Sequence, residues 1–354
     1  MRESVKRRAY GSVQENINLG VLRDLKFPIP SLALQVKIAD FLTMLDDRIA
    51  LLRETNATLE AIAQALFKSW FVDFDPVRAK QEGREPEGMD AATAALFPSE
   101  FEDSELGHTP SVGRVSPTGV TRQIRDEASD GNVGLRCANP IYRLGLVPKG
   151  WLISSVYDLA QYINGAAYRA FEPNSERRGL PIIKIAELKA GVTSQTRFSD
   201  VEMPLKYKIS TRDILFSWSG NPDTSIDTFV WPHEDAWLNQ HIFRVVPSTE
   251  QERSFVLLTL KHLKPVFAEI ARNKQTTGLG HVTVSDLKRL RVVQPCNLLL
   301  ERWNELVDPL LERTFLFEQQ AQTLATLRDT LLPRLISGQL RLPEAETILE
   351  AANA

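Results

Sequence analysis

The stretch LQVKIADFLTMLDDRIALLRETNATLEAIAQALFKSWF, residues 34–71, decides the fold of this 354-residue chain. Its apolar residues recur mostly at steps of three and four, the pattern of a helix that buries a continuous stripe along one side. The predicted stripe consists of Ile38, Leu42, Leu45, Ile49, Leu52, Leu59, Ile62, Leu66 and Trp70. Proline disfavours a helical conformation in the residue before it, so we expect Pro30 to precede the helix and Pro76 to follow its end.

A second stripe of the same kind lies near the end of the chain. It runs through Leu306, Leu310, Phe317, Leu324, Leu327, Leu331 and Leu335. Both stripes belong to one internal repeat, because a shift of 265 places NINLGVLRDLKFPIP (16–30) on HVTVSDLKRLRVVQP (281–295) without a gap. Such self-similarity predicts two equivalent helical rods that pair antiparallel. The alternative is that both are merely amphipathic helices.

Composition and charge narrow the class of protein. Apolar residues make up 43% and charged residues 25%, which argues against disorder throughout the chain. The net charge of −3 excludes a uniformly basic nucleic-acid coat protein and leaves room for a local basic face. Two cysteines without CxxC spacing and five histidines without an HExxH pattern predict no metal site. No apolar run reaches about 18 residues, so we expect a cytoplasmic protein without a membrane span.

The middle of the chain differs in composition from its ends. Residues 146–300 carry 19 Lys and Arg against 15 Asp and Glu, and basic residues there are interleaved with aromatics, which suits a nucleic-acid-binding surface. A solvated surface with a slight positive excess is the alternative. Short β-like runs lie at 180–185, 213–218, 228–231 and 242–246. With a helical pattern at 254–272 they predict an α+β domain. Residues 73–145 are rich in Pro, Gly, Glu and Ser and are expected to form a partly disordered linker or insert.

Several short segments are similar, in order and spacing, to one protein family. They are PKGW (148–151), DILFSWSG (213–220), LNQH (238–241), NKQTTG (273–278), LPRLISG (332–338) and the helix lead-in with Pro30, Gln35 and Ile38. On these segments the chain resembles the specificity (S) subunit of a type I restriction–modification system. The resemblance covers nearly everything except about residues 108–142.

The resemblance implies a modular plan in which target-recognition domains alternate with long helices. Each recognition domain would read half of a split DNA site, and the paired helices would set the distance between the halves. For this chain we expect an α+β fold: a mixed α/β recognition domain plus two long helices pairing as an antiparallel coiled coil. The expected segments are the closing part of an incomplete first recognition domain (1–33), a first long helix (34–72), the linker or insert (73–145), the recognition domain (146–297), a second long helix (298–338) and a C-terminal tail (339–354).

The resemblance also implies a function and a set of partners. The chain would be a non-catalytic, sequence-specific DNA-binding subunit that directs methylation and cleavage by partner subunits to a bipartite target. Its partners would be double-stranded DNA, the type I methyltransferase (M) subunits and, through the complex, the restriction (R) subunit. With only one complete recognition domain, self-association of two copies would supply the second half-site. No cofactor is expected, since methyl transfer and ATP-driven cleavage would belong to the partners.

The resemblance places the DNA contacts in loops of the recognition domain. Lysine and arginine there would chiefly contact phosphates, whereas asparagine and glutamine would pair with adenine edges and Arg169 with guanine. The candidate residues are Arg169, Lys184, Lys206, Lys208, Ser219, Asn221, Asn239, Gln240, His241, Lys274, Gln275, Thr276, Thr277 and His281. For each of them a structural role in a loop or turn is the alternative.

Three other functions compete with this interpretation. Asn139-Pro140-Ile141-Tyr142 is similar to a motif of amino-methylating enzymes, but the chain has no glycine-rich turn of the kind that holds the methyl donor. Asp158 with Glu187 and Lys189 would suit a metal-dependent nuclease, although such spacing arises often by chance. The third alternative is a coiled-coil scaffold, or an inactive remnant of a specificity subunit, that does not bind DNA.

Overall fold

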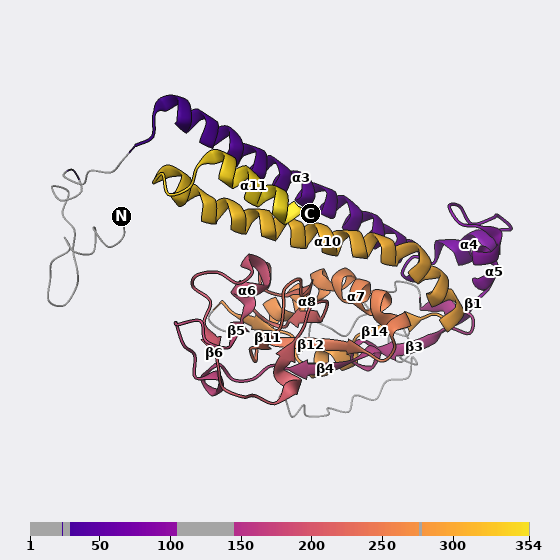
Figure 1. Ribbon diagram of the computed structural model, residues 1–354. Helices are drawn as coiled ribbons and strands as arrows, with labels where there is room; N and C mark the ends of the chain where they lie inside the picture. The colour runs from indigo at the N-terminus through magenta and orange to yellow at the C-terminus, as the bar shows by residue number, and fades with distance from the viewer. Residues whose placement is uncertain (1–22, 24–28, 105–144, 276–277, 354) are drawn as a thin grey trace, which may run out of the picture. The chain divides into compact units, whose positions relative to one another are not determined.

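The computed structural model describes residues 23, 29–104, 145–275 and 278–353 (Figure 1). The chain divides into two compact units. The first comprises Met1–Glu54 and Phe317–Ala354, and the second is the continuous stretch Thr55–Leu316. Each boundary between the units falls inside a long helix, so each unit holds one part of both helices.

Two helices of equal length are the longest elements of the chain. Helix α3 spans Leu32–Phe71 and helix α10 spans Asn297–Ile336, and each has 40 residues. Their first residues are 265 positions apart, and so are their last residues. This is the shift of the sequence repeat, so the repeat extends to the points where both helices begin and end.

The two helices pack antiparallel within each unit. In the first unit, Ile38 near the start of α3 shares a buried cluster with Leu335 near the end of α10. In the second unit, the ring of Trp70 near the end of α3 lies 5.4 Å from the ring of Trp303 near the start of α10. The structure confirms the expected antiparallel pairing.

Two positions of the predicted stripes are exposed. Ile62 is 44% exposed and Leu306 is 43% exposed, whereas the neighbouring Ala63 and Val307 are fully buried. In the second unit the helices also cover a core of aromatic side chains, among them Phe67 and Trp303. Because aromatic residues bury the largest areas, their burial decides the rotation of the helices there, and the aliphatic residues follow.

The remaining helices are shorter, and most lie in the second unit. They are α4 (Asp75–Gln81), α5 (Ala91–Leu96), α6 (Ile185–Ala190), α7 (Arg253–His262), α8 (Lys264–Asn273), α9 (Val284–Arg289) and, in the first unit, α11 (Leu342–Asn353). Single 3-10 turns are η2 (Val156–Leu159), η3 (Tyr168–Phe171), η4 (Leu205–Tyr207) and η5 (Glu250–Glu252).

The second unit contains two four-stranded sheets and several short ladders. The strands are β1 (Phe101–Asp103), β2 (Leu146–Pro148), β3 (Leu152–Ser155), β4 (Ala160–Asn164), β5 (Leu180–Ile183), β6 (Phe198–Ser199), β7 (Lys208–Ile209), β8 (Ile214–Ser217), β9 (Ser219–Gly220), β10 (Asp227–Val230), β11 (Ala236–Leu238), β12 (Ile242–Pro247), β13 (Gly280–His281) and β14 (Arg291–Gln294). One sheet is antiparallel in the order β10–β8–β12–β4, and the other is mixed in the order β6–β5–β11–β7. Pairs form between β1 and β2, β13 and β9, and β14 and β3.

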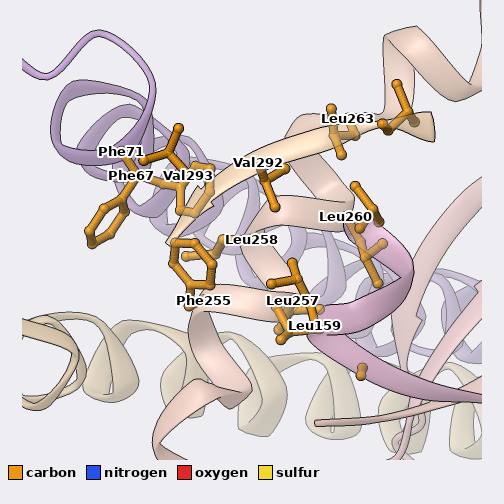
Figure 2. Close-up of a cluster of buried hydrophobic side chains, with 14 of the residues drawn as sticks. Phe67, Phe71, Leu159, Phe255, Leu257, Leu258, Leu260, Leu263, Val292 and Val293 are labelled. Atoms are coloured by element: carbon orange, nitrogen blue, oxygen red, sulfur yellow. The ribbon is translucent and has the colours of Figure 1, made fainter. Parts of the chain in front are cut away.

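The main core of the second unit brings the recognition domain and the long helices together. Helix α7 is buried throughout Ser254–Leu260. Figure 2 shows Phe255 of α7 near Phe67 and Phe71 of α3. On the sheet side, Phe216 of β8 lies 4.9 Å, ring to ring, from Phe267 of α8. The expected α+β fold is confirmed, and one hydrophobic core joins the sheet to the helix pair.

The structure differs from the expected linker between residues 73 and 103. Phe74, Val77 and Phe97 are buried in the main core, and the ring of Phe97 lies 5.2 Å from that of Trp70. The ammonium of Lys80 donates to the carbonyls of Ala94 and Phe97 and thereby closes the α4–α5 hairpin. The composition of this segment is mainly polar, so its few apolar residues did not stand out in the sequence. Their burial is nevertheless enough to order the segment. The rest of the expected linker, 105–144, and most of the expected closing segment 1–33 lie outside the described residues.

The expected C-terminal tail forms helix α11 in the structure. Leu340 and Ala345 are buried in the cluster that also contains Leu331 and Leu335 of α10. Figure 1 shows α11 lying beside the long helices within the first unit. The apolar face of α11, formed by Leu342, Ala345, Ile348 and Leu349, packs against this cluster. The last segment is therefore a packed helix and not an extended tail.

Candidate nucleic-acid interface

Basic side chains lie over tyrosine rings beside the mixed sheet. We name Tyr168, Arg169, Lys184, Lys206 and Tyr207 the aromatic–basic cluster. Lys184 Nζ lies 5.2 Å from the ring centroid of Tyr168, and Lys206 Nζ lies 4.9 Å from that of Tyr207. Both tyrosines pack against a small buried core of Ala166, Phe171, Ile182 and Trp237. The core holds the rings, and the cation–π contacts hold the ammonium groups at the surface.

The charges of this cluster are not neutralised by neighbouring carboxylates. Within the part of the chain that the structure describes, Arg169, Lys184 and Lys206 form no ion pair. Lys208 differs, because its Nζ lies 2.6 Å from a carboxylate oxygen of Asp235. Hydrogen bonds from Lys208 and Ser210 hold the pKa of Asp235 below its usual value. These three cations therefore remain available to an anion, whereas the charge of Lys208 is already paired with that of Asp235.

A second group of polar and aromatic side chains gathers where β9 pairs with β13. We name Asn164, Trp218, Ser219, Gln240, His241 and His281 the Trp218 cluster. The Trp218 indole N–H donates to Asn164 Oδ1 at 3.2 Å, and its ring centroid lies 5.6 Å from that of His241. Gln240 Nε2 lies 3.3 Å from His241 Nε2. His281 pairs with Ser219 across the two-stranded ladder, so the cluster joins residues from four separate parts of the chain.

The two clusters meet at Ala166. Its backbone pairs with Asn239, and its carbonyl accepts a 2.8 Å hydrogen bond from the amide of Gln240. Gly165 permits this close approach, since a Cβ there would lie 2.3 Å from the carbonyl oxygens of Leu238 and Asn239. The aromatic–basic cluster and the Trp218 cluster thus form one continuous site on the recognition domain.

Other predicted site residues have partners inside the domain. Asn221 Oδ1 accepts from the amides of Asp223 and Thr224, and the Asn239 side chain is buried. Lys274 forms an ion pair with Asp286, and Gln275 donates to the Gly278 carbonyl. Thr276 and Thr277 lie outside the described residues. The structure therefore distinguishes these predicted residues, which have a partner, are buried or lie outside the described residues, from Arg169, Lys184 and Lys206, which form no ion pair among the described residues.

The candidate list omitted the aromatic members of the site. Tyr168, Tyr207 and Trp218 stand beside predicted residues in the sequence, but only the folded chain shows that the two tyrosines support cations and that Trp218 contacts His241. Asn164 carried no signal of its own. An aromatic residue next to Lys or Arg in a loop was the available clue, because bases and cations both bind ring faces.

The residues considered for catalysis have structural roles. The Asp158 carboxylate accepts from the Ser155 hydroxyl, and Ser155 in turn caps η2 by accepting from the Asp158 amide. Buried Glu187 accepts from the Lys184 amide and from Thr196 at the start of α6. Asn139 lies outside the described residues. Among the residues described, no three His, Cys, Asp or Glu side chains are grouped to hold a metal ion. Likewise, no described helix is long and apolar enough to cross a membrane.

Comparison with known families identifies the class of protein. The family model for the type I restriction modification DNA specificity domain matches residues 1–61 and 148–296, which together are more than half of the chain. The chain therefore belongs to this family. It is a non-catalytic specificity subunit of a restriction system that modifies DNA.

Individual relatives carry the same description. The specificity subunit of the type I restriction enzyme HindI from Haemophilus influenzae is 29% identical over 339 residues, which cover 92% of this chain and 71% of the relative. The MjaIX specificity subunit from Methanocaldococcus jannaschii is 24% identical over 97% of this chain and 67% of the relative. A crystal structure of the type I S subunit from M. genitalium, 15% identical, gives a TM-score of 0.46 and covers 95% of this chain and 69% of that one.

Proposed function

We propose that this chain binds double-stranded DNA sequence-specifically through the aromatic–basic and Trp218 clusters. One observation carries the proposal: three cations without an ion pair among the described residues, two of them lying over tyrosine rings, adjoin a group of half-buried hydrogen-bonding side chains. Phosphates are attracted to cations of this kind without regard to sequence, and polar side chains beside them are in reach of base edges. The same unit thus supplies both affinity and readout.

Some candidate residues already have an ion-pair or hydrogen-bond partner in the protein and others do not. We rank the candidate DNA contacts on this difference. Arg169, Lys184 and Lys206 are proposed as phosphate contacts, with Arg169 also able to pair with guanine. Gln240 is proposed as the adenine reader, since its half-buried amide lies beside His241. Ser219, His241 and His281 are further candidates for base-edge contacts. Asn221, Asn239, Lys208, Lys274, Gln275, Thr276 and Thr277 remain predictions of lower rank.

The partners follow from the family. We propose that the long helices hold M subunits, that the R subunit joins through that complex, and that the complex acts on a bipartite target in the cytoplasm. Methyl transfer and cleavage would then take place on the partner subunits without a cofactor on this chain. The recognition domain at 146–297 would read one half-site, and self-association would bring the other.

The test is selection of duplexes by the chain in complex with its M subunit. A pool of random-sequence duplexes is enriched by binding, and the affinity for the winning duplex is compared with that for a scrambled duplex of equal composition at several salt concentrations. We expect a preferred sequence, an affinity that falls steeply with salt, and methylation of a split motif. A chain that holds the M subunit but retains no duplex at moderate salt would instead be a scaffold or remnant.

A further inference from the structure

A row of polar residues on α10 faces the recognition domain. Asn304, Asp308 and Glu312 follow each other at steps of four and therefore share one face of the helix. Asn304 Nδ2 donates to the Gln251 carbonyl at 2.8 Å, and its Oδ1 accepts from Ser254. Positions 39, 43 and 47 of α3, related by the repeat, hold Ala, Thr and Asp. The complete row therefore belongs to α10 and does not come from the repeat.

Glu312, the last residue of this row, binds Arg212 of the recognition domain. The Arg212 guanidinium donates two hydrogen bonds of 2.6 Å, one to each oxygen of the Glu312 carboxylate. It also lies 4.6 Å from the ring centroid of Phe315, one turn further along α10. A bidentate ion pair combined with stacking on an aromatic ring fixes the orientation of a guanidinium. An ion pair through a single hydrogen bond does not.

The backbone of Arg212 is held as firmly as its side chain. Its φ is +76°, a left-handed conformation that residues with a side chain rarely adopt. Its amide donates to the Trp231 carbonyl at 2.8 Å, and its own carbonyl accepts from Arg253. A chain held in an unfavoured conformation from several sides is a feature of sites where geometry matters for function.

Strand β8 leads directly from this corner to the candidate site. It begins two residues after Arg212 and is followed at once by Trp218 and Ser219. All four of its residues are buried, and it pairs with β10 on one side and β12 on the other. Such a strand is stiff, so a displacement of the Arg212 corner moves the Trp218 cluster with it.

We propose that Arg212 is a positioning residue that sets the orientation of the Trp218 cluster relative to α10. Phe255, packed on Phe71, which in turn packs on Trp303, provides one attachment of the recognition domain to the helices, and Arg212 on Glu312 provides another. Nine helical steps from Trp303 to Glu312 separate these attachments by about 14 Å along α10. Together with the Asn304 hydrogen bonds and the Lys261–Glu60 ion pair, the Arg212 pair opposes rotation of the domain about the aromatic attachment. The inference rests on the proposed DNA-binding function.

The test uses the full chain in complex with its M subunit and the variant Arg212→Gln. Affinities are measured for the duplex selected by the wild type and for its scrambled counterpart. We expect the ratio of the two affinities to fall by about tenfold or more, the scale of one wrong base pair. The scrambled-duplex affinity and its salt dependence should stay within about twofold, because the phosphate-contacting lysines are untouched.

Three further variants guard against loss of folding. Glu312→Gln removes the same bond without altering the strained corner and should lower the ratio equally. The exchange Arg212→Glu with Glu312→Arg should restore the ratio to within about threefold of the wild type by recreating the pair. Arg302→Gln removes an exposed ion pair with Glu305 on the same helix and should change nothing.

The outcomes separate the inference from the proposed function. Unchanged ratios in both Arg212→Gln and Glu312→Gln, with the wild type selective, would overturn the positioning role alone. Equal losses of affinity for both duplexes would also overturn it, since they would show a merely structural role. A wild-type complex without any preferred duplex would overturn the proposed function and the positioning role together.

Discussion

The Lys274 ammonium lies 2.6 Å from each of the two carboxylate oxygens of Asp286. Asp286 also accepts from the amide and hydroxyl of Thr283, so it closes the capping box of α9 and ties that helix to the end of α8. The β13 strand with His281 lies between these two helices in the chain. The pair therefore fixes the base of the loop that carries part of the Trp218 cluster.

We expect the stability that Asp286 contributes to depend on pH. Burial by itself raises the pKa of this carboxyl, but the hydrogen bonds from Lys274 and Thr283 outweigh it and hold the pKa below its usual value. A lowered pKa in the folded state means that the contribution is fully present above the unfolded pKa of about 3.9 and is lost as the pH falls through the folded value. Thermal unfolding measured from neutral to acid pH should show Asp286→Asn destabilised by about 1–3 kcal/mol at neutral pH. The gap to wild type should close in acid, and a gap that is constant with pH would contradict this account.

Removing two lysines of the aromatic–basic cluster should weaken DNA binding in a salt-dependent way. If Lys184 and Lys206 each contact one phosphate, Lys184→Gln with Lys206→Gln should lower the magnitude of the slope of log affinity against log salt by about 1.8. The sequence preference should be retained, since these lysines read no bases. Fluorescence anisotropy at several salt concentrations measures the slope. Lys149→Gln, which removes a lysine paired with Glu100, is the matched control, and an equal effect there would refute the assignment.

Adding a single methyl group at Gly280 should disrupt the Trp218 cluster. A Cβ at this position would lie 2.1 Å from the Ala271 carbonyl oxygen, closer than any tolerated contact. Because the obstacle is helix backbone, Gly280→Ala must displace β13 and should cost about 1–3 kcal/mol of unfolding free energy. Denaturant unfolding measures the cost. At Gly150 there is open space around the added Cβ, and only its positive φ opposes the change, so Gly150→Ala should cost about 1 kcal/mol.

Trp303 should be the most sensitive position of the main core. Its ring is fully buried and lies 4.9 Å from that of Phe71 and 5.4 Å from that of Trp70. Trp303→Ala should destabilise the second unit by about 3–5 kcal/mol through the lost burial and the cavity that remains. Differential scanning calorimetry checks this. Leu298→Ala, an exposed apolar position of the same helix, should shift the midpoint only slightly, and similar shifts for both would argue against this core.

Local sequence patterns predicted the regular elements well. The apolar steps of three and four marked both long helices, and the predicted runs at 180–185, 213–218, 228–231 and 242–246 coincide with β5, β8, β10 and β12. These signals were readable because helix and strand periodicity is a property of neighbouring residues. The same local view failed at Ile62 and Leu306, where an aromatic core elsewhere in the fold decided which side of the helix is buried.

The candidate site was only partly predictable. The loops at 166–169, 206–208 and 239–241 do lie close together, through the pairing of Ala166 with Asn239 and the small core that Tyr168 and Tyr207 share. The sequence did not reveal that Lys208 and Lys274 have acidic partners, whereas Lys184 and Lys206 have none among the residues that the structure describes. The reason is that Asp235 and Asp286 come within reach only through strand pairing and helix capping, which bring distant residues together.

The amino-acid sequence alone determined the two equal helices, their repeat, the α+β domain between them and the membership in a family of DNA specificity subunits. These depend on periodicity and on short segments that are read locally. Tertiary structure alone decided which cations have a carboxylate partner within the described part of the chain, that Trp218 contacts His241, that Ser219 pairs with His281, and that Arg212 binds Glu312. A charge or hydrogen-bonding group acts according to its neighbours in space, and folding chooses those neighbours.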